Sequence, residues 1–205
     1  MSTWSIVPSG LWQHVHVPSF TRAELEAFRD HEVPDLIGPG VRLVFVGINP
    51  GLWTAATQTH FAHPGNRFYP ALHFAGITPT PIDPGRGMTD ADRQMMVELG
   101  IGITNLARRA TARADELSRE ELQAGAIALE RFVNEHKPRV VAVAGITAYR
   151  TAFGLPKAKA GLQPAPLGGA ELWIVPNPSG LNAHETITSL AAAYAEPARA
   201  AGIID

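Results

Sequence analysis

The sequence predicts an α/β protein of three layers, α/β/α, in which helices cover both faces of a central, mostly parallel sheet of four or five strands. Short apolar runs bounded by glycine or proline recur along the chain, as is typical of parallel strands buried on both faces. Helical patterns separate these runs. Strands that alternate with helices build a mostly parallel sheet covered on both sides.

The expected strands and helices follow one another along most of the chain. The first strand lies within Val41–Gly47, an apolar run that ends in glycine. Similar runs follow at Gly102–Leu106, Arg139–Gly145 and Glu171–Pro176. Helical patterns cover Asn66–Ala75, Thr89–Leu99, Ser118–His136, Thr147–Phe153 and His184–Ala201. Segments rich in proline and glycine, at 78–87 and 155–169, predict surface loops.

Local signals mark several helix ends. Ser118 and Glu121 have the spacing of a capping box, and Lys137-Pro138 ends that helix because the residue before proline avoids helical geometry. Thr21 and Glu24 predict a second box in a short helix. That helix lies in the proline-rich residues 1–40, which we interpret as an N-terminal extension of unknown role, followed by one domain at 41–205.

Composition narrows the chemistry. The chain has 205 residues, 45% of them hydrophobic, which is enough to bury the core of one ordinary domain. It has no cysteine, so disulfides, thiolate nucleophiles, zinc–thiolate sites and iron–sulfur clusters are excluded. No apolar run approaches the roughly 20 residues that cross a bilayer. We therefore expect a monomeric cytoplasmic protein, nucleoid-associated in a prokaryote, with no cofactor and no membrane partner.

The charge balance argues against nonspecific coating of nucleic acid. Seventeen Lys and Arg residues stand against 19 Asp and Glu residues, which gives a net charge of −2. Arg108, Arg109 and Arg113 are close in sequence and could form a local phosphate-facing edge. Scattered, solvated charge explains the same residues equally well.

Two strands end in the same kind of turn. The first runs into Gly47-Ile48-Asn49-Pro50-Gly51 and the last into Pro176-Asn177-Pro178-Ser179-Gly180-Leu181. Ligands of open α/β sheets bind beyond the carboxyl ends of the strands, so both turns should border one site. Each proline restricts the asparagine before it. One such turn alone is ordinary turn chemistry, and the repetition is what favours a site.

With these motifs the chain closely resembles the mismatch-specific uracil-DNA and thymine-DNA glycosylase family. The resemblance covers Val41 to about Tyr194. Besides the two turns it rests on His63-Pro64-Gly65-Asn66-Arg67-Phe68, on Gly-Ile-Thr-Asn-Leu at 102–106, and on Glu121-Leu122 with Gly125. It implies a monofunctional glycosylase of base-excision repair that flips uracil out of double-stranded DNA and hydrolyses its glycosidic bond, with thymine and etheno-cytosine opposite guanine as further candidate substrates.

The resemblance also implies which residues form the DNA wedge and the base pocket. Leu181 would enter the base stack, with Asn177, Ser179 and Gly180 beside the DNA backbone. A contact within the protein core is the alternative for Leu181. Ile48 and Phe61 would meet the flipped base, which stacks on the Phe61 ring. Asn66 would position the loop or touch the base, Asn105 would face the pocket or cap its strand, and Gly51 would leave room for the methyl group of thymine.

Asn49 is the candidate catalytic residue that would hold the attacking water. An amide orients water but cannot accept a proton near neutrality, so stabilisation of the departing base must supply most of the catalysis. A nearby carboxylate would help, and Asp115 is the candidate. Asp115 could instead only complete a turn or pair with Arg113.

Other interpretations remain open. His63 could act as an acid or base, although the resemblance implies a structural role. His60 and His63 lack a third ligand in the motif, so we expect no metal site. The chain could also be a noncatalytic reader of DNA damage with the same fold, or a hydrolase of free nucleosides.

Overall fold

The computed structural model describes residues 19–205, and its centre is a five-stranded sheet. The strands are β1 (Leu43–Gly47), β2 (Ile101–Asn105), β3 (Val140–Ala144), β4 (Gly161–Leu162) and β5 (Glu171–Val175). Their order is β2-β1-β3-β5-β4, and all neighbours are parallel except β4 with β5. The predicted mostly parallel α/β fold is therefore confirmed.

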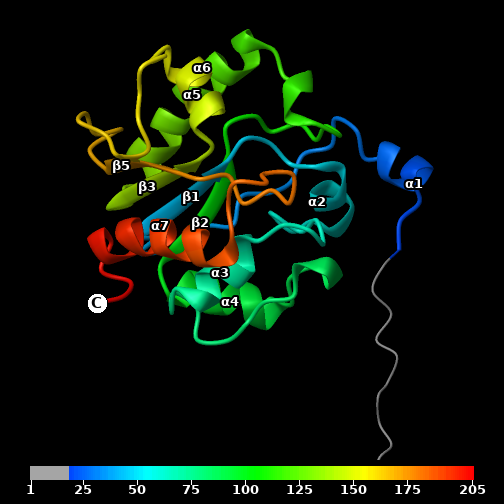
Figure 1. Ribbon diagram of the computed structural model, residues 1–205, viewed down its shortest axis with the longest axis horizontal. Coiled ribbons are helices and arrows are strands. Elements are labelled where there is room, and N and C mark those ends of the chain that lie inside the picture. Colours follow the sequence, from blue (N-terminus) through cyan, green and yellow to red (C-terminus); the bar gives the residue numbers. More distant parts are fainter. Residues whose placement is uncertain (1–18) are drawn as a thin grey trace, which may run out of the picture.

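Side chains of β1 alternate between two cores. Leu43 and Phe45 belong to the core on one face, whereas Val44 and Val46 belong to the core on the other. All four are fully buried, as the apolar run predicts for a central strand. In Figure 1, α5 and α6 lie above the sheet, and α3, α4 and α7 lie below it. The fold thus has the three predicted layers.

The helices α3 to α7 agree with the sequence patterns to within three residues, and α1 is the short helix expected after Thr21. Their bounds are α1 Arg22–Glu26, α2 Leu52–Thr57, α3 Phe68–Phe74, α4 Asp90–Glu98, α5 Arg119–His136, α6 Ile146–Phe153 and α7 Ile187–Ala200. The capping boxes at Thr21 and Ser118 are both present. The helix α5 ends before Pro138, as predicted, with Lys137 in a left-handed conformation.

Four short elements lay outside the prediction. The six-residue helix α2 follows the first turn directly, with Gly51 as its N-cap. The two-residue strand β4 lies inside the segment predicted to be a loop. Two 3₁₀ turns, Pro84–Arg86 and Ala114–Glu116, complete the chain path. The helix α2 matters most, because its residue Thr54 lines the cavity at the carboxyl ends of β1 and β5.

The described part of the proposed extension contacts the domain. Leu36 exchanges two backbone hydrogen bonds with Ile103, of 2.9 and 2.8 Å, and so covers the outer edge of β2. Val33 and Leu36 are both buried. Residues 19–40 therefore include a segment that packs against the sheet, and residues 1–18 lie outside the described part of the chain.

Candidate active site

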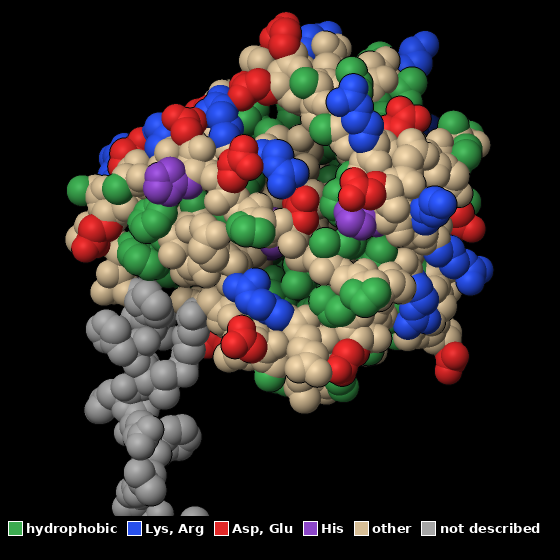
Figure 2. All heavy atoms as spheres, turned by 180° about the vertical axis from the view of Figure 1, so that it is seen from behind, with side chains coloured by type: hydrophobic (Ala, Val, Ile, Leu, Met, Phe, Trp, Pro, Cys, Tyr) green, Lys and Arg blue, Asp and Glu red, His purple; other side chains and the backbone are tan. Residues whose placement is uncertain are grey.

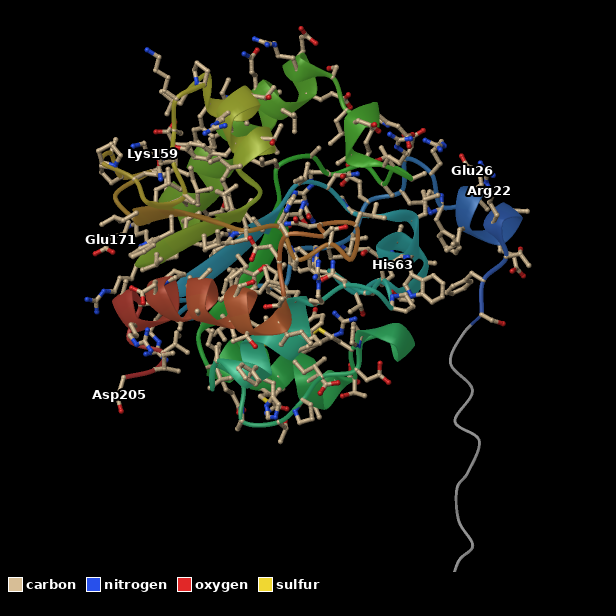
Figure 3. All side chains as sticks on the ribbon, in the orientation of Figure 1. Arg22, Glu26, His63, Lys159, Glu171 and Asp205 are labelled. Carbon is tan, nitrogen blue, oxygen red and sulfur yellow. The ribbon has the colours of Figure 1, made fainter. Side chains whose placement is uncertain are left out.

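Both predicted turns border one cavity of about 520 Å³ at the carboxyl ends of β1 and β5. All the predicted site residues except Asp115 line it: Ile48, Asn49, Gly51, Phe61, Asn66, Asn105, Asn177, Ser179, Gly180 and Leu181. His63, labelled in Figure 3, lies on the segment after α2 and lines the same cavity. The sheet therefore brings together residues that are up to 133 positions apart, since Ile48 and Leu181 share this cavity (181 − 48 = 133).

The side-chain amide of Asn49 has a fixed orientation. Its Nδ2 lies 2.8 Å from the carbonyl oxygen of Pro50, 3.3 Å from that of Arg109, and 2.7 Å from Oγ1 of Thr111. Carbonyl oxygens only accept hydrogen bonds, so the group facing them must be the NH₂. Among the described residues, no donor bonds to Asn49 Oδ1. This oxygen remains available as an acceptor in the cavity.

Phe61 is held in a left-handed backbone conformation, with φ of 56°. Its ring stacks on Phe68 at a centroid distance of 4.1 Å and an interplanar angle of 26°. Gly47 makes room for this ring, because a Cβ at Gly47 would lie 3.3 Å from Phe61 and 2.4 Å from Oδ1 of Asn105. The glycine that ends β1 thus permits the aromatic wall of the cavity.

Two backbone N–H groups of the cavity are unpaired. Within residues 19–205, the N–H groups of Ile48 and Phe61 donate to no acceptor, while the carbonyl of Ile48 accepts a 2.8 Å bond from the N–H of Ala107. Both residues line the cavity. Free N–H groups in such a place can bind negative charge that develops on a ligand.

Asn105 is tied to a buried histidine. Its Nδ2 lies 3.1 Å from Nδ1 of His60, and Nε2 of His60 lies 2.9 Å from the carbonyl oxygen of Pro34. Burial lowers the pKa of His60, which is only 4% exposed. Both ring nitrogens are occupied, so His60 cannot bind a metal ion.

Asn66 acts on the loop before α3. Its Oδ1 accepts a 2.9 Å hydrogen bond from the N–H of Phe68, and its own N–H donates to the carbonyl of His63 at 2.7 Å. These bonds give the segment a fixed shape. Asn66 also lines the cavity, so the structure allows both roles that the sequence left open.

Short-range hydrogen bonds shape the segment 177–185, which we call the wedge loop. Asn177 Oδ1 accepts from the N–H of Ser179 at 3.0 Å, and Ser179 Oγ accepts from the N–H of Leu181 at 3.3 Å. Leu181 itself is 93% exposed, so it is not a core contact. The loop presents an apolar side chain to solvent at the mouth of the cavity.

Arg67 clamps the wedge loop. Its guanidinium donates to the carbonyl oxygens of Ser179 at 2.6 Å and Asn182 at 2.8 Å, and also to that of Glu185. The loops also touch through their backbones, because a Cβ at Gly180 would lie 2.6 Å from the carbonyl oxygen of Gly65. The wedge loop is therefore positioned by the segment that leads into α3.

Asp115 does not line the cavity of Asn49, although the neighbouring Ala114 does. It belongs to the 3₁₀ turn Ala114–Glu116, is paired with Arg113, and has a side chain 62% exposed. It lines a neighbouring cavity of about 720 Å³ that shares Ile48, Asn177 and Leu181 with the first. The pairing with Arg113 that the sequence allowed is present. A catalytic role for Asp115 stays a prediction.

The arginines after β2 are paired with carboxylates. Arg109 bonds to Glu121 at 2.5 Å and to Asp30 at 3.0 Å, and Arg108 lies 3.3 Å from Asp35. The bond from Arg109 lowers the pKa of Glu121 to about 2. In Figure 2 positive and negative side chains are interspersed over the visible face. Arg108 and Arg109 therefore connect the loop after β2 to α5 and to the segment that contains Asp30 and Asp35.

Four residues at the site were missed or misjudged from the sequence. Thr111 and Arg67 act through hydrogen bonds to residues far away in the sequence, which no local sequence pattern predicts. Thr54, one turn into α2, is 5% exposed and lines the cavity. His60, which the sequence suggests only as a possible metal ligand, is instead bonded to Asn105 and Pro34. For Thr54, His60 and Arg67, the clustering of polar residues in the segment 54–67 is a sequence signal that could have indicated the site.

Comparisons with known proteins identify the family and the fold. The family model described as the uracil DNA glycosylase superfamily matches residues 34–196. A solution NMR structure of a candidate uracil DNA glycosylase from Methanosarcina acetivorans is similar in fold, with a TM-score of 0.57 and 15% identity. That match covers 83% of this chain and 98% of the other. The chain belongs to the uracil DNA glycosylase superfamily, whose activity is that of a DNA N-glycosylase.

Proposed function

We propose that this protein is a monofunctional glycosylase of the mismatch-specific branch that removes uracil from double-stranded DNA by hydrolysis. The proposal joins the superfamily membership to the contents of the 520 Å³ cavity. It needs no cofactor, because the reaction is a displacement by water at a sugar carbon.

The observation that carries the proposal is the available oxygen of Asn49. Three acceptors surround Nδ2 and hold the amide plane, while Oδ1 has no donor among the described residues and can accept a hydrogen bond from one water molecule in the cavity. A water fixed in this way has lost much of its freedom before the reaction starts, which lowers the barrier.

The chemical step follows from these groups. As the bond between C1′ of the sugar and N1 of the base breaks, both electrons leave with the base and C1′ becomes cationic. The water held by Asn49 adds its oxygen to C1′, and its surplus proton passes to solvent or to the base. Asn49 orients this water and accepts no proton.

The departing base carries negative charge, which backbone donors can stabilise. The unpaired N–H groups of Ile48 and Phe61 suit this task because they are already in place and need no rearrangement. The Phe61 ring, supported by Phe68, offers a stacking surface worth about 1–3 kcal/mol to an extruded base.

Duplex DNA requires a further element, because a stacked base cannot reach any cavity. Leu181 is 93% exposed on a loop that Arg67 clamps, an arrangement suited to an apolar wedge that fills the gap in the stack. The same wedge disfavours a hydrolase of free nucleosides, which has no stack to fill.

The cavity favours a broad substrate range. A Cβ at Gly51 would meet nothing within 4 Å, so the wall of the cavity is open at this residue. We therefore extend the proposal to thymine and etheno-cytosine opposite guanine, whose additional atoms need space in the pocket.

A direct assay tests the proposal. Duplexes with uracil opposite guanine are incubated with the protein, and abasic sites are detected by cleavage in alkali. We expect strand breaks at the uracil position. Binding of the same duplex without strand breaks would instead identify a noncatalytic reader of DNA damage. Parallel duplexes with thymine or etheno-cytosine define the substrate range.

A further inference from the structure

One motif of the resemblance, formed by Glu121 and Gly125, lies in α5 and does not line the cavity at the carboxyl ends of β1 and β5. The two residues are four positions apart, so they share one face of the helix. A Cβ at Gly125 would lie 2.2 Å from the carbonyl oxygen of Leu106. The helix therefore touches the start of the loop after β2 with this face.

Glu121 holds Arg109 of that loop by two hydrogen bonds. Nε of Arg109 lies 2.5 Å from Oε1 of Glu121, and Nη2 lies 3.2 Å from Oε2. The N–H of Ser118 donates to the same Oε2 at 2.8 Å, which fixes the carboxylate at the start of α5. A twofold contact between arginine and a carboxylate is strong and directional. The pair thus attaches the loop to a long helix.

The segment before β1 holds the same part of the loop from another side. Nη1 of Arg109 donates to Asp30 at 3.0 Å, and Nη2 donates to the carbonyl oxygen of Glu116 at 3.1 Å. Ala110 is fully buried, and its backbone bonds to the N–H of Asp30 and the carbonyl oxygen of His31, both at 2.9 Å. Residues 109 and 110 are therefore anchored by α5 and by the N-terminal segment together.

This anchored loop supplies two of the three acceptors that face Nδ2 of Asn49. They are the carbonyl oxygen of Arg109, at 3.3 Å, and Oγ1 of Thr111, at 2.7 Å. Any shift of the loop would move both acceptors and turn the amide. An error of about 1 Å in the place of a reacting group can lower a rate by about a hundredfold.

We propose that Glu121 and Arg109 are positioning residues, which hold the loop after β2 and thereby fix the amide of Asn49 that orients the attacking water. This inference rests on the proposed function. Neither side chain lines the cavity, so neither contacts the base or the water. The proposal gives a role to the motif of α5 and to the backbone of residues 30 and 31.

Contact with a DNA phosphate would be a different role for Arg109. Loss of such a contact weakens binding and reduces its dependence on salt. The guanidinium of Arg109 is instead only about one-third exposed and donates to Asp30, Glu116 and Glu121. A positioning role therefore predicts a lower rate at unchanged affinity for DNA.

The substitution Arg109→Met tests this, because it removes the guanidinium and keeps a long side chain. We expect the single-turnover rate on saturating uracil-containing duplex to fall at least about fivefold, while affinity is unchanged. Arg108→Met is the matched control, since Arg108 lies 3.3 Å from Asp35 but does not bond to Asn49. An equal loss of rate in the control, or a loss of affinity alone, overturns the proposal.

A double substitution separates positioning of Asn49 from a general effect on the fold. If Arg109 acts through Asn49, Arg109→Met lowers the rate no further in the Asn49→Ala background. An equal loss in both backgrounds overturns the proposal. Absence of base release by the unsubstituted protein would refute the proposed function instead.

A second pair of variants serves in case Arg109→Met does not fold. Glutamine can complete a capping box, so Glu121→Gln keeps the start of α5 and removes the charge that binds Arg109. Ser118→Ala breaks the other half of the box and leaves the pair intact. We expect a rate at least about threefold lower for Glu121→Gln at unchanged Tm, and a lower Tm at normal rate for Ser118→Ala. Equal rates of these two variants overturn the proposal.

Discussion

The hydroxyl of Thr111 accepts a 2.7 Å hydrogen bond from Nδ2 of Asn49 and donates one of 2.7 Å to the carbonyl oxygen of Arg113. Thr111 is 1% exposed, and its N–H bonds to the carbonyl oxygen of Pro50 at 3.2 Å. The loop after β2 is thereby attached to the turn after β1. This attachment fixes the amide of Asn49, a residue that lines the cavity.

Thr111→Val should slow base release by about tenfold, because the valine keeps the shape but removes the acceptor that faces Asn49. Thr111→Ser retains the hydroxyl and should keep most of the rate. Single-turnover rates of both variants test this, with thermal melting as the check on folding. Equal rates for Val and Ser would show that the Pro50 and Arg109 carbonyls suffice to orient the amide.

Leu181→Ala should weaken binding to duplex substrate far more than to single-stranded substrate, because only a duplex has a stacking gap to fill. Leu162 is also exposed, at 55%, but lies away from the cavity, so Leu162→Ala is a matched control. Titrations with both forms of DNA give the comparison. A similar loss on duplex and single strands would argue against a wedge.

Gly51→Tyr should narrow the substrate range. Gly51 has φ of −76°, which any residue can adopt, and a Cβ there meets nothing within 4 Å. The ring should therefore fill part of the cavity without unfolding the protein. We expect release of thymine and etheno-cytosine to be lost while uracil is retained, and Gly51→Ala to keep all of them. Persisting thymine release by the Tyr variant would mean that another residue sets the range.

Asp115→Asn tests whether the carboxylate of Asp115 assists catalysis. The substitution keeps the shape and removes the charge. If the carboxylate assists catalysis, the single-turnover rate of the Asn variant should be at least about tenfold lower, while its thermal stability is unchanged. Asp115 is paired with Arg113 and lines the adjacent cavity, which shares Ala114 with the cavity of Asn49. Unchanged rates would leave Asn49 and the backbone donors as the whole catalytic apparatus.

The strands and their turns were predictable because burial on both faces leaves a plain signal in sequence. The apolar run before Gly47 predicted the strand β1 and, from the position of its end, the place of the turn residues that line the cavity. The six-residue helix α2 was missed because it is too short for a helical period and lies directly after a proline-glycine turn.

Contacts across the fold could not be predicted in the same way. His60 and Asn105 are 45 residues apart, and nothing local to either residue indicates their hydrogen bond. The start of α7 illustrates the same limit. The pattern predicted a helix from His184, but α7 begins at Ile187, because Glu185 belongs to the loop that Arg67 clamps and Thr186 forms the N-cap.

The most direct test of the mechanism is the single-turnover rate of Asn49→Ala, measured together with its affinity for uracil-containing duplex. Asn49 orients the attacking water in this account, which is a role in the transition state and not in DNA binding. We predict that base release falls at least about a hundredfold while DNA affinity is retained. Near-normal base release by this variant would contradict the account and remove Asn49 from the mechanism.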